Sequence, residues 1–173
     1  MEPESLNDAM IHTSACDVLG VAYPIVQAGM ARSNTGADLV AAVCAAGGLG
    51  VLGCLDRPPS EAVAEIGRIR ARTDRPFGVN FVLHRLDEET FAACLAERVP
   101  VFSFFRGDPE DAVARAHGAG AVTIHQVTTV AEAARACAVG VDMVVAQGRE
   151  AGGHMGPLPL HSLLAQRPRS PGV

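Results

Sequence analysis

Short apolar runs rich in β-branched and aromatic residues alternate along the chain with longer Ala-rich segments, in which Glu and Arg recur at helical spacing. The apolar runs predict strands and the longer segments predict helices. The predicted strands are Ile25–Gln27, Leu49–Gly53, Phe77–Val82, Val101–Phe105, Val122–Gln126 and Met143–Gln147. The predicted helices are Ala37–Ala46, Glu61–Arg72, Glu88–Arg98, Pro109–His117 and Ala131–Ala138.

The spacing of these elements predicts a parallel α/β sheet. Successive strands begin roughly 21 to 28 residues apart, which leaves room for one crossover helix between each pair. A closed barrel and an open doubly wound sheet are built from the same unit, so periodicity alone does not choose between them.

Several helix ends carry recognisable signals. Asp108 before Pro109 predicts a capping carboxylate ahead of a proline at the first helical position. Thr129 and Glu132 have the spacing of a capping box. Three glycines follow predicted helices and should let the chain turn left-handed there: Gly47, Gly118 and Gly140.

Length and composition indicate one soluble domain. The 173 residues are 49% hydrophobic, which is enough for one substantial core and too little for two ordinary domains. No apolar run approaches the roughly 20 residues of a membrane span. The N-terminus is acidic where a secretory signal would be basic. We therefore expect a cytoplasmic protein without a membrane partner.

Charge and residue usage argue against several other classes. A net charge of −5, a single Tyr and no Trp provide neither an electrostatic nor a stacking surface for nucleic acid. The 18 glycines suit an α/β enzyme whose turns approach a ligand closely. Five cysteines stand singly and are expected to be reduced core residues: Cys16, Cys44, Cys54, Cys94 and Cys137.

Candidate chemistry lies at the C-terminal ends of the strands, where parallel α/β folds bind their ligands. Four places have suitable side chains: Gln27-Ala28-Gly29-Met30, Gly78-Val79-Asn80, Gln126, and the run from Gln147 to His154. The last run combines three glycines, a carboxylate and an imidazole that can exchange a proton near neutral pH. An ordinary turn with an exposed histidine, and amides that cap neighbouring backbone, would explain the same residues.

Three other site types lack support. Gly48-Leu49-Gly50-Val51-Leu52-Gly53 fits the dinucleotide-binding fingerprint by letter, but it follows a predicted helix and is itself a predicted strand. The remaining histidines lack the spacing of a metal site. No serine stands in the nucleophile elbow of a hydrolase.

The strand-end motifs together resemble the nitronate monooxygenases, formerly called 2-nitropropane dioxygenases. The resemblance covers about residues 18 to 156. It is carried by Ile25-Val26-Gln27-Ala28-Gly29-Met30, Ala45-Ala46-Gly47-Gly48-Leu49-Gly50, Pro76-Phe77-Gly78-Val79-Asn80, Gln126-Val127-Thr128-Thr129-Val130 and Gln147-Gly148-Arg149-Glu150-Ala151-Gly152-Gly153-His154.

This resemblance implies a TIM-barrel fold with non-covalent FMN and a small-molecule substrate. A nitronate or nitroalkane would be oxidised with O₂ to a carbonyl compound and nitrite. His154 falls where the family has its active-site histidine, and Gln126 occupies a position near the flavin where some members have lysine. The other implied cofactor-binding residues are Met30, Asn80, Gln147, Gly152 and Gly153.

The resemblance also implies that the 173 residues form an incomplete barrel of about six of eight βα units, with residues 1–17 as an extension and 167–173 as an irregular tail. Open strand edges would invite self-association. Two alternatives remain. One is an NAD(P)H-dependent flavin reductase of the enoyl or quinone type, and the other is a non-catalytic remnant.

Overall fold

The sheet is parallel throughout and its strands lie in chain order. The computed structural model describes residues 11–30 and 34–166. Its sheet runs β1-β2-β3-β4-β5, and each strand pairs in parallel with the next. The strands are β1 (Val51–Gly53), β2 (Gly78–Val82), β3 (Val101–Phe105), β4 (Val122–Val127) and β5 (Met143–Ala146). Five of the six predicted strands are therefore confirmed.

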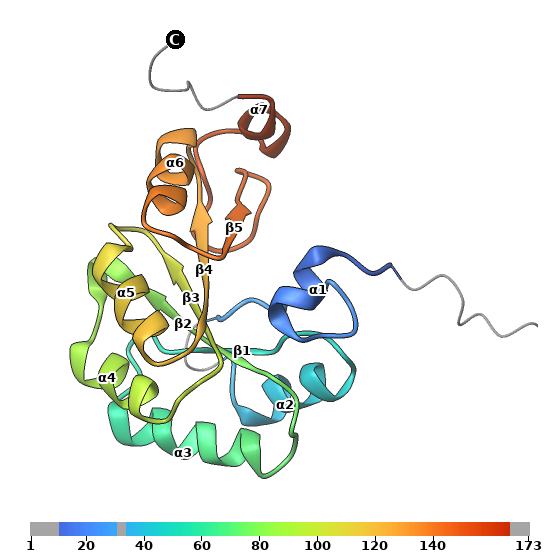
Figure 1. The fold of residues 1–173 in the computed structure, drawn as a ribbon, viewed down its shortest axis with the longest axis vertical. Helices are drawn as coiled ribbons and strands as arrows, with labels where there is room; N and C mark the ends of the chain where they lie inside the picture. The colour runs from blue at the N-terminus through green and yellow to red at the C-terminus, as the bar shows by residue number, and fades with distance from the viewer. Residues whose placement is uncertain (1–10, 31–33, 167–173) are drawn as a thin grey trace, which may run out of the picture.

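Helices lie on both sides of these strands. Figure 1 shows α3, α4 and α5 on one side of the sheet and α1 on the other. The helices are α1 (Ser14–Leu19), α2 (Ala37–Ala45), α3 (Pro59–Arg70), α4 (Glu88–Ala96), α5 (Glu110–Gly118), α6 (Val130–Ala138) and α7 (Leu160–Ala165), and one turn of 3₁₀ helix spans Leu83–Arg85. All five predicted helices are present, with ends shifted by one or two residues, whereas α1 and α7 were not predicted.

The predicted first strand is reduced to a single bridge. Val26 pairs in parallel with Leu49, and the Gln27 N–H donates to the Leu49 carbonyl at 2.9 Å. Beyond that point the Gln27 side chain replaces backbone pairing. Its amide accepts from the Val51 N–H and donates to the Val51 carbonyl, both at 3.2 Å. The chain is thus anchored to β1 while its backbone turns away.

The core between the sheet and the helices α2 to α5 contains a cluster of phenylalanine rings. The ring of Phe91 on α4 meets three strand phenylalanines edge-on, with centroids 5.2 Å from Phe81, 5.6 Å from Phe102 and 6.0 Å from Phe104. Such pairs add about 0.5 to 1.5 kcal/mol each beyond the burial of their area. This packing fixes β2 and β3 against α4.

The opposite face of the sheet has its own apolar core, which lies around the first residues of the strands. Cys16 and Leu19 of α1 pack there against Leu49, Val51 and Ile124. The helix ends at Gly20, whose φ of 67° is left-handed. Helix α1 therefore covers the N-terminal ends of the strands on this face, which we call the inner face. Their C-terminal ends on the same face carry the polar residues described below.

Glycine also permits close packing of α2 against β1. A Cβ on Gly50 would lie 2.3 Å from the Val40 carbonyl oxygen, so no larger residue fits without a shift. The run that matched the dinucleotide fingerprint therefore belongs to a helix–strand contact, and it leads into β1 as predicted.

Most helix-end signals are confirmed. Thr129 and Glu132 form the predicted capping box, and Gly47 and Gly140 have φ of 94° and 82°. The prediction for Gly118 was wrong, because α5 continues through it and the left-handed residue is Gly120, with φ of 80°. The prediction at the start of α5 was one residue early: Asp108 accepts from the Glu110 N–H at 3.1 Å, and α5 begins at Glu110.

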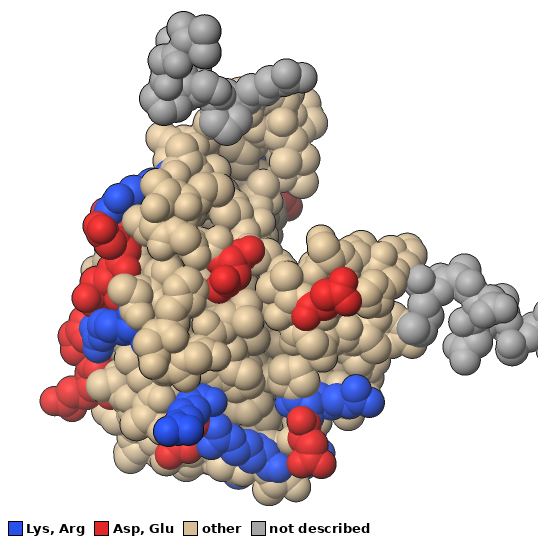
Figure 2. Space-filling model, in the orientation of Figure 1, with Lys and Arg blue, Asp and Glu red and all other residues tan. Residues whose placement is uncertain are grey.

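Charged side chains gather on the outer helices and mostly pair there. Figure 2 shows acidic and basic side chains intermingled along the margin of the molecule, with much of the face toward the viewer carrying neither. Arginines link each helix from α3 to α6 with the next one, or with a residue beside it, through three ion pairs: Arg70–Glu97, Arg115–Glu88 and Arg135–Asp108.

The cysteine prediction holds for four of the five thiols. Cys16, Cys44, Cys54 and Cys94 are free and buried, whereas Cys137 on α6 is exposed. Across residues 11–30 and 34–166, no helix is long and apolar enough to cross a membrane. The expected tail at 167–173 and the first ten residues of the expected extension lie outside the described residues.

Candidate active site at the C-terminal ends of the strands

The polar side chains of β2, β3 and β4 meet on the inner face of the sheet. Asn80 pairs with Ser103 in the parallel register, and the Ser103 hydroxyl donates to the Asn80 Oδ1 at 3.0 Å. Both residues are buried. The Gln126 amide nitrogen lies 3.4 Å from the Ser103 Oγ and 3.5 Å from the Asn80 Oδ1, near the limit for a hydrogen bond. The Asn80 oxygen therefore already accepts a hydrogen bond, and its NH₂ group donates none to another residue in the described part of the chain.

Ser103 was not among the predicted site residues. In the sequence, Ser103 was considered only as a hydrolase nucleophile and was rejected because it lacks the nucleophile elbow. The period of two could have identified it, since it places Ser103 on the same face as Val101 and Phe105. That Ser103 lies opposite Asn80 could be known only from the register of β2 and β3 in the structure.

The segment after the first bridge lies across the ends of β1 and β2. A Cβ on Gly53 would lie 1.7 Å from the Met30 carbonyl oxygen, and a Cβ on Gly29 would lie 2.4 Å from the Asn80 Cβ. Only glycine at these two positions permits this approach. The Met30 side chain is 41% exposed, while its carbonyl accepts from the Thr35 hydroxyl at 2.9 Å.

The loop after β5 folds back onto Gln147. The Gln147 amide nitrogen lies 3.0 Å from the His154 carbonyl oxygen and 3.4 Å from that of Gly152. Its Oε1 is buried, and within the described part of the chain it has no hydrogen-bond partner. Gly153 is left-handed at φ 71°, and the Cβ positions of Gly152 and Gly153 face open space. Two of these glycines thus leave room beside the loop.

The carboxylate in this loop has a structural partner. Glu150 accepts from the backbone N–H of Leu160, the first residue of α7, at 3.0 and 3.2 Å. Hydrogen bonds from its own N–H and from that of Leu160 lower the pKa of the Glu150 carboxyl. Glu150 therefore anchors α7 rather than facing the strand ends as a proton acceptor.

His154 is brought beside the end of β3. Its ring centroid lies 5.9 Å from that of Phe105, the last residue of β3, at an interplanar angle of 41°. The guanidinium of Arg106 lies 5.3 Å from the centroid of the same Phe105 ring. The Phe105 ring thus contacts both an imidazole and a cation at the edge where the strands end.

The predicted residues fall into two groups along this edge. Asn80 lies within β2, Gln126 lies near the end of β4, and Gln147 and His154 follow β5, whereas Met30 lies over β1 at the other end of the strand order. Among the described residues, no hydrogen bond joins Met30 to Gln147 or His154. A ligand touching both groups would have to extend along the edge of the sheet.

Comparison with known proteins identifies a family. The family model described as nitronate monooxygenase matches residues 12–96 and 87–169. A carboxyl-CoA dehydrogenase of Mycobacterium tuberculosis, (3aS,4S,5R,7aS)-5-hydroxy-7a-methyl-1-oxo-octahydro-1H-indene-4-carboxyl-CoA dehydrogenase, is 36% identical over 89% of this chain and 43% of its own length. A nitronate monooxygenase of Paraburkholderia phytofirmans is 35% identical over 80% of this chain and 49% of its own length.

Solved structures agree. FabK of Thermotoga maritima is similar with a TM-score of 0.84 and 33% identity, over 90% of this chain and 50% of that one. The nitroalkane oxidase of Streptomyces ansochromogenes gives a TM-score of 0.73 and 33% identity, over 83% of this chain and 51% of that one. The chain spans about half the length of the relatives it matches.

Proposed function

Because the chain belongs to the nitronate monooxygenase family, we propose that it contributes to a flavin-dependent oxidoreductase that binds FMN along the C-terminal edge of its sheet. In this proposal the substrate is an alkyl nitronate or nitroalkane, and O₂ is the second substrate. The products are a carbonyl compound and nitrite. No part of the proposal involves a metal, and among the described residues no three potential ligands gather in one place.

The observation that carries the proposal is the unmatched hydrogen-bonding capacity at this edge. Asn80 offers an NH₂ donor whose orientation Ser103 fixes, and the buried Gln147 Oε1 is an acceptor that needs a donor. The polar edge of an isoalloxazine ring presents both carbonyl acceptors and an N–H donor. Gln126 lies beside Asn80 and would extend the same set.

Backbone groups would complete the cofactor contacts. Met30 lies over the end of β1, where Gly53 leaves room for it. At the β5 end, Gly152 and Gly153 have open space in place of side chains, so their backbone can approach a ring closely. We assign these three residues to backbone contacts with FMN.

His154 is the residue we assign to chemistry. Its imidazole would remove the α-proton of a neutral nitroalkane, or stand beside the anionic nitro group of a nitronate. Phe105 would hold the imidazole in place through ring contact. When bound, the flavin supplies the redox capacity that no side chain has, taking electrons from the substrate and delivering them to O₂. Gln126 contributes no charge, where some family members have lysine.

A second candidate is an oxidoreductase that exchanges electrons between an acyl thioester and NAD(P)H or its oxidised form through the flavin. It is favoured by the relatives named as carboxyl-CoA dehydrogenases in Mycobacterium tuberculosis and Rhodococcus jostii, which are 36% and 34% identical to this chain. The proposed cofactor contacts are the same for both candidates, so only the source of electrons separates them.

Anaerobic reduction of the bound flavin tests this choice. FMN-loaded protein is mixed in a stopped-flow spectrometer with propyl-2-nitronate, NADH or NADPH, and flavin bleaching is followed. The proposal predicts bleaching by the nitronate without any pyridine nucleotide. Bleaching by NADH or NADPH alone would favour the second candidate, and a protein that takes up no FMN would contradict both.

A further inference from the structure

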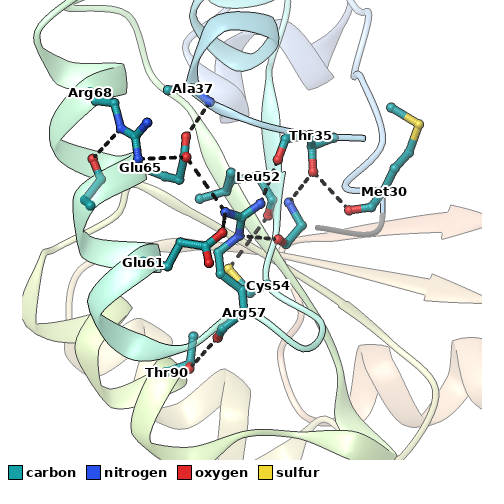
Figure 3. A network of polar contacts seen from close by, with 12 residues as sticks. Met30, Thr35, Ala37, Leu52, Cys54, Arg57, Glu61, Glu65, Arg68 and Thr90 are labelled. Atoms are coloured by element: carbon teal, nitrogen blue, oxygen red, sulfur yellow. Dashed lines mark hydrogen bonds and ion pairs between the residues drawn. The ribbon is translucent and has the colours of Figure 1, made fainter. Parts of the chain in front are cut away.

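A fully buried arginine lies just beyond the end of β1. Arg57 is 2% exposed, and such a cation is tolerated only with good partners. Its Nε donates to the Gly53 carbonyl at 3.0 Å and its Nη2 to the Thr35 carbonyl at 2.8 Å. Figure 3 shows the guanidinium between these two segments. The planar guanidinium thus donates to two backbone carbonyls that are far apart in sequence.

Carboxylates of α3 balance the charge. Glu61 accepts from the Arg57 Nη1 at 2.6 Å, and a Glu65 oxygen lies 3.9 Å from the same nitrogen. The other Glu65 oxygen accepts from the Ala37 N–H at 2.6 Å, at the start of α2. The network therefore ties α3 and α2 to the C-terminal end of β1.

From Thr35 the network continues to the candidate site. The buried Thr35 hydroxyl accepts from the Gly53 N–H at 2.9 Å and donates to the Met30 carbonyl at 2.9 Å. Arg57 fixes both residues that flank this hydroxyl contact, since it bonds to Gly53 and to Thr35. Arg57 is thus linked to Met30 through one intermediate residue, Thr35.

We propose that Arg57 is a positioning residue for the cofactor site, which fixes Met30 through Thr35 and so sets how the Met30 backbone meets the flavin. This inference rests on the proposed function. A lysine could neutralise the charge of Glu61. Its single ammonium group, however, cannot bond to both backbone carbonyls with the geometry of the planar guanidinium. Geometry, and not charge alone, is therefore what Arg57 contributes.

Two variants and one control separate this role from general stability. Arg57→Lys keeps the buried positive charge and loses the planar guanidinium that bonds to both carbonyls. Thr35→Val removes the hydroxyl that joins Gly53 to Met30 and leaves the Arg57–Glu61 ion pair in place. Arg72→Met is the control, because Arg72 is an exposed arginine that pairs with Asp38 of α2 and, among the described residues, has no hydrogen bond to Met30 or Thr35.

Two measurements are made on the full chain. Hydrogen exchange at the Gly53 amide is followed without flavin, and the FMN dissociation constant is obtained by fluorescence titration. In Arg57→Lys we expect exchange at Gly53 to accelerate and the dissociation constant to rise about tenfold, as for one or two lost hydrogen bonds. Thr35→Val should weaken FMN similarly, and the double variant should be no weaker than the worse single one. Arg72→Met should match the wild type.

The outcomes distinguish the two proposals. If the wild type binds no FMN, the proposed function fails, while Gly53 exchange still decides whether Arg57 orders this segment. Unchanged exchange in a folded Arg57→Lys overturns the positioning role. Faster exchange with an unchanged dissociation constant overturns its link to the cofactor. If Arg57→Lys does not fold, Thr35→Val decides: weaker FMN binding supports the inference and wild-type binding overturns it.

Discussion

The Gln147 amide nitrogen lies 3.0 Å from the carbonyl oxygen of His154. The residue that directly follows β5 therefore bonds to the loop that carries the candidate base. A second contact to the Gly152 carbonyl, at 3.4 Å, braces the middle of the same loop. His154 is thus held from two sides, by Gln147 through its backbone and by Phe105 through its ring.

Loss of the Gln147 side chain should loosen this loop. Removing one or two hydrogen bonds of about 1 kcal/mol each should raise the open population roughly fivefold or more. Trypsin cleavage after the exposed Arg149 would report that opening, with Gln147→Ala cut correspondingly faster than the wild type. Gln126→Ala is the matched control, because Gln126 is also a glutamine near the end of a strand and, within the described residues, its side chain bonds to Asn80 and Ser103 and not to this loop. Equal cleavage rates in the two variants would show that Gln147 does not brace it.

The loss of His154 should separate two substrates. In FMN-loaded His154→Ala, flavin should be retained, and turnover of neutral 2-nitropropane should fall by about 10² to 10⁴. Propyl-2-nitronate should be affected far less, since it needs no deprotonation. His161→Ala, on α7, serves as the control. An equal loss on both substrates would make His154 a binding residue, and loss of FMN would make it a structural one.

The fold was largely predictable from the sequence because each strand and each outer helix carries its own periodicity. Two elements differed from the prediction, the first strand and helix α1. Gln27 ends the first strand early by bonding to Val51 with its side chain. The six-residue α1 is too short for a periodic signal, although Cys16 and Leu19 make it part of the inner core.

The stability of the fold should depend on pH through a buried histidine. His125 of β4 is 2% exposed, and within the described residues its Nδ1 has no hydrogen-bond partner. Burial lowers the pKa of the His125 imidazole below its usual 6.5, although Glu132 and Asp108 partly oppose the shift. The unfolded chain therefore binds this proton more readily than the folded one.

A lowered folded-state pKa means that the stabilisation is present above about pH 6.5 and is lost as the pH falls below it toward the folded pKa. Urea unfolding measured at several pH values should show the free energy of unfolding decline through this window. His125→Leu should flatten that decline, while His161→Leu should leave it unchanged. A wild-type slope retained in His125→Leu would assign the pH dependence to other groups.

The candidate site was only partly predictable. Asn80, Gln126, Gln147 and His154 could be identified because they are polar residues within or after apolar strands, toward the ends where parallel folds bind ligands. The roles of Ser103 and Arg57 depend on which segments meet: Ser103 acts through the register with β2, and Arg57 through carbonyls from two distant segments. The strand period could place Ser103 on the inner face, but its contact with Asn80 and the contacts of Arg57 could not be inferred from sequence.

The central claim is that FMN binds along the strand ends through groups that include the Asn80 amide donor, and a fluorescence titration with FMN tests it most directly. Asn80→Asp keeps the size of the side chain and replaces the donor NH₂ with an acceptor oxygen. We predict that the wild-type chain binds FMN and that Asn80→Asp weakens binding by about tenfold or more, as expected when a donor is lost from a buried polar contact. Arg72→Met should bind as the wild type does. No FMN binding by the wild type, or equal dissociation constants for the wild type and a folded Asn80→Asp, would contradict the account.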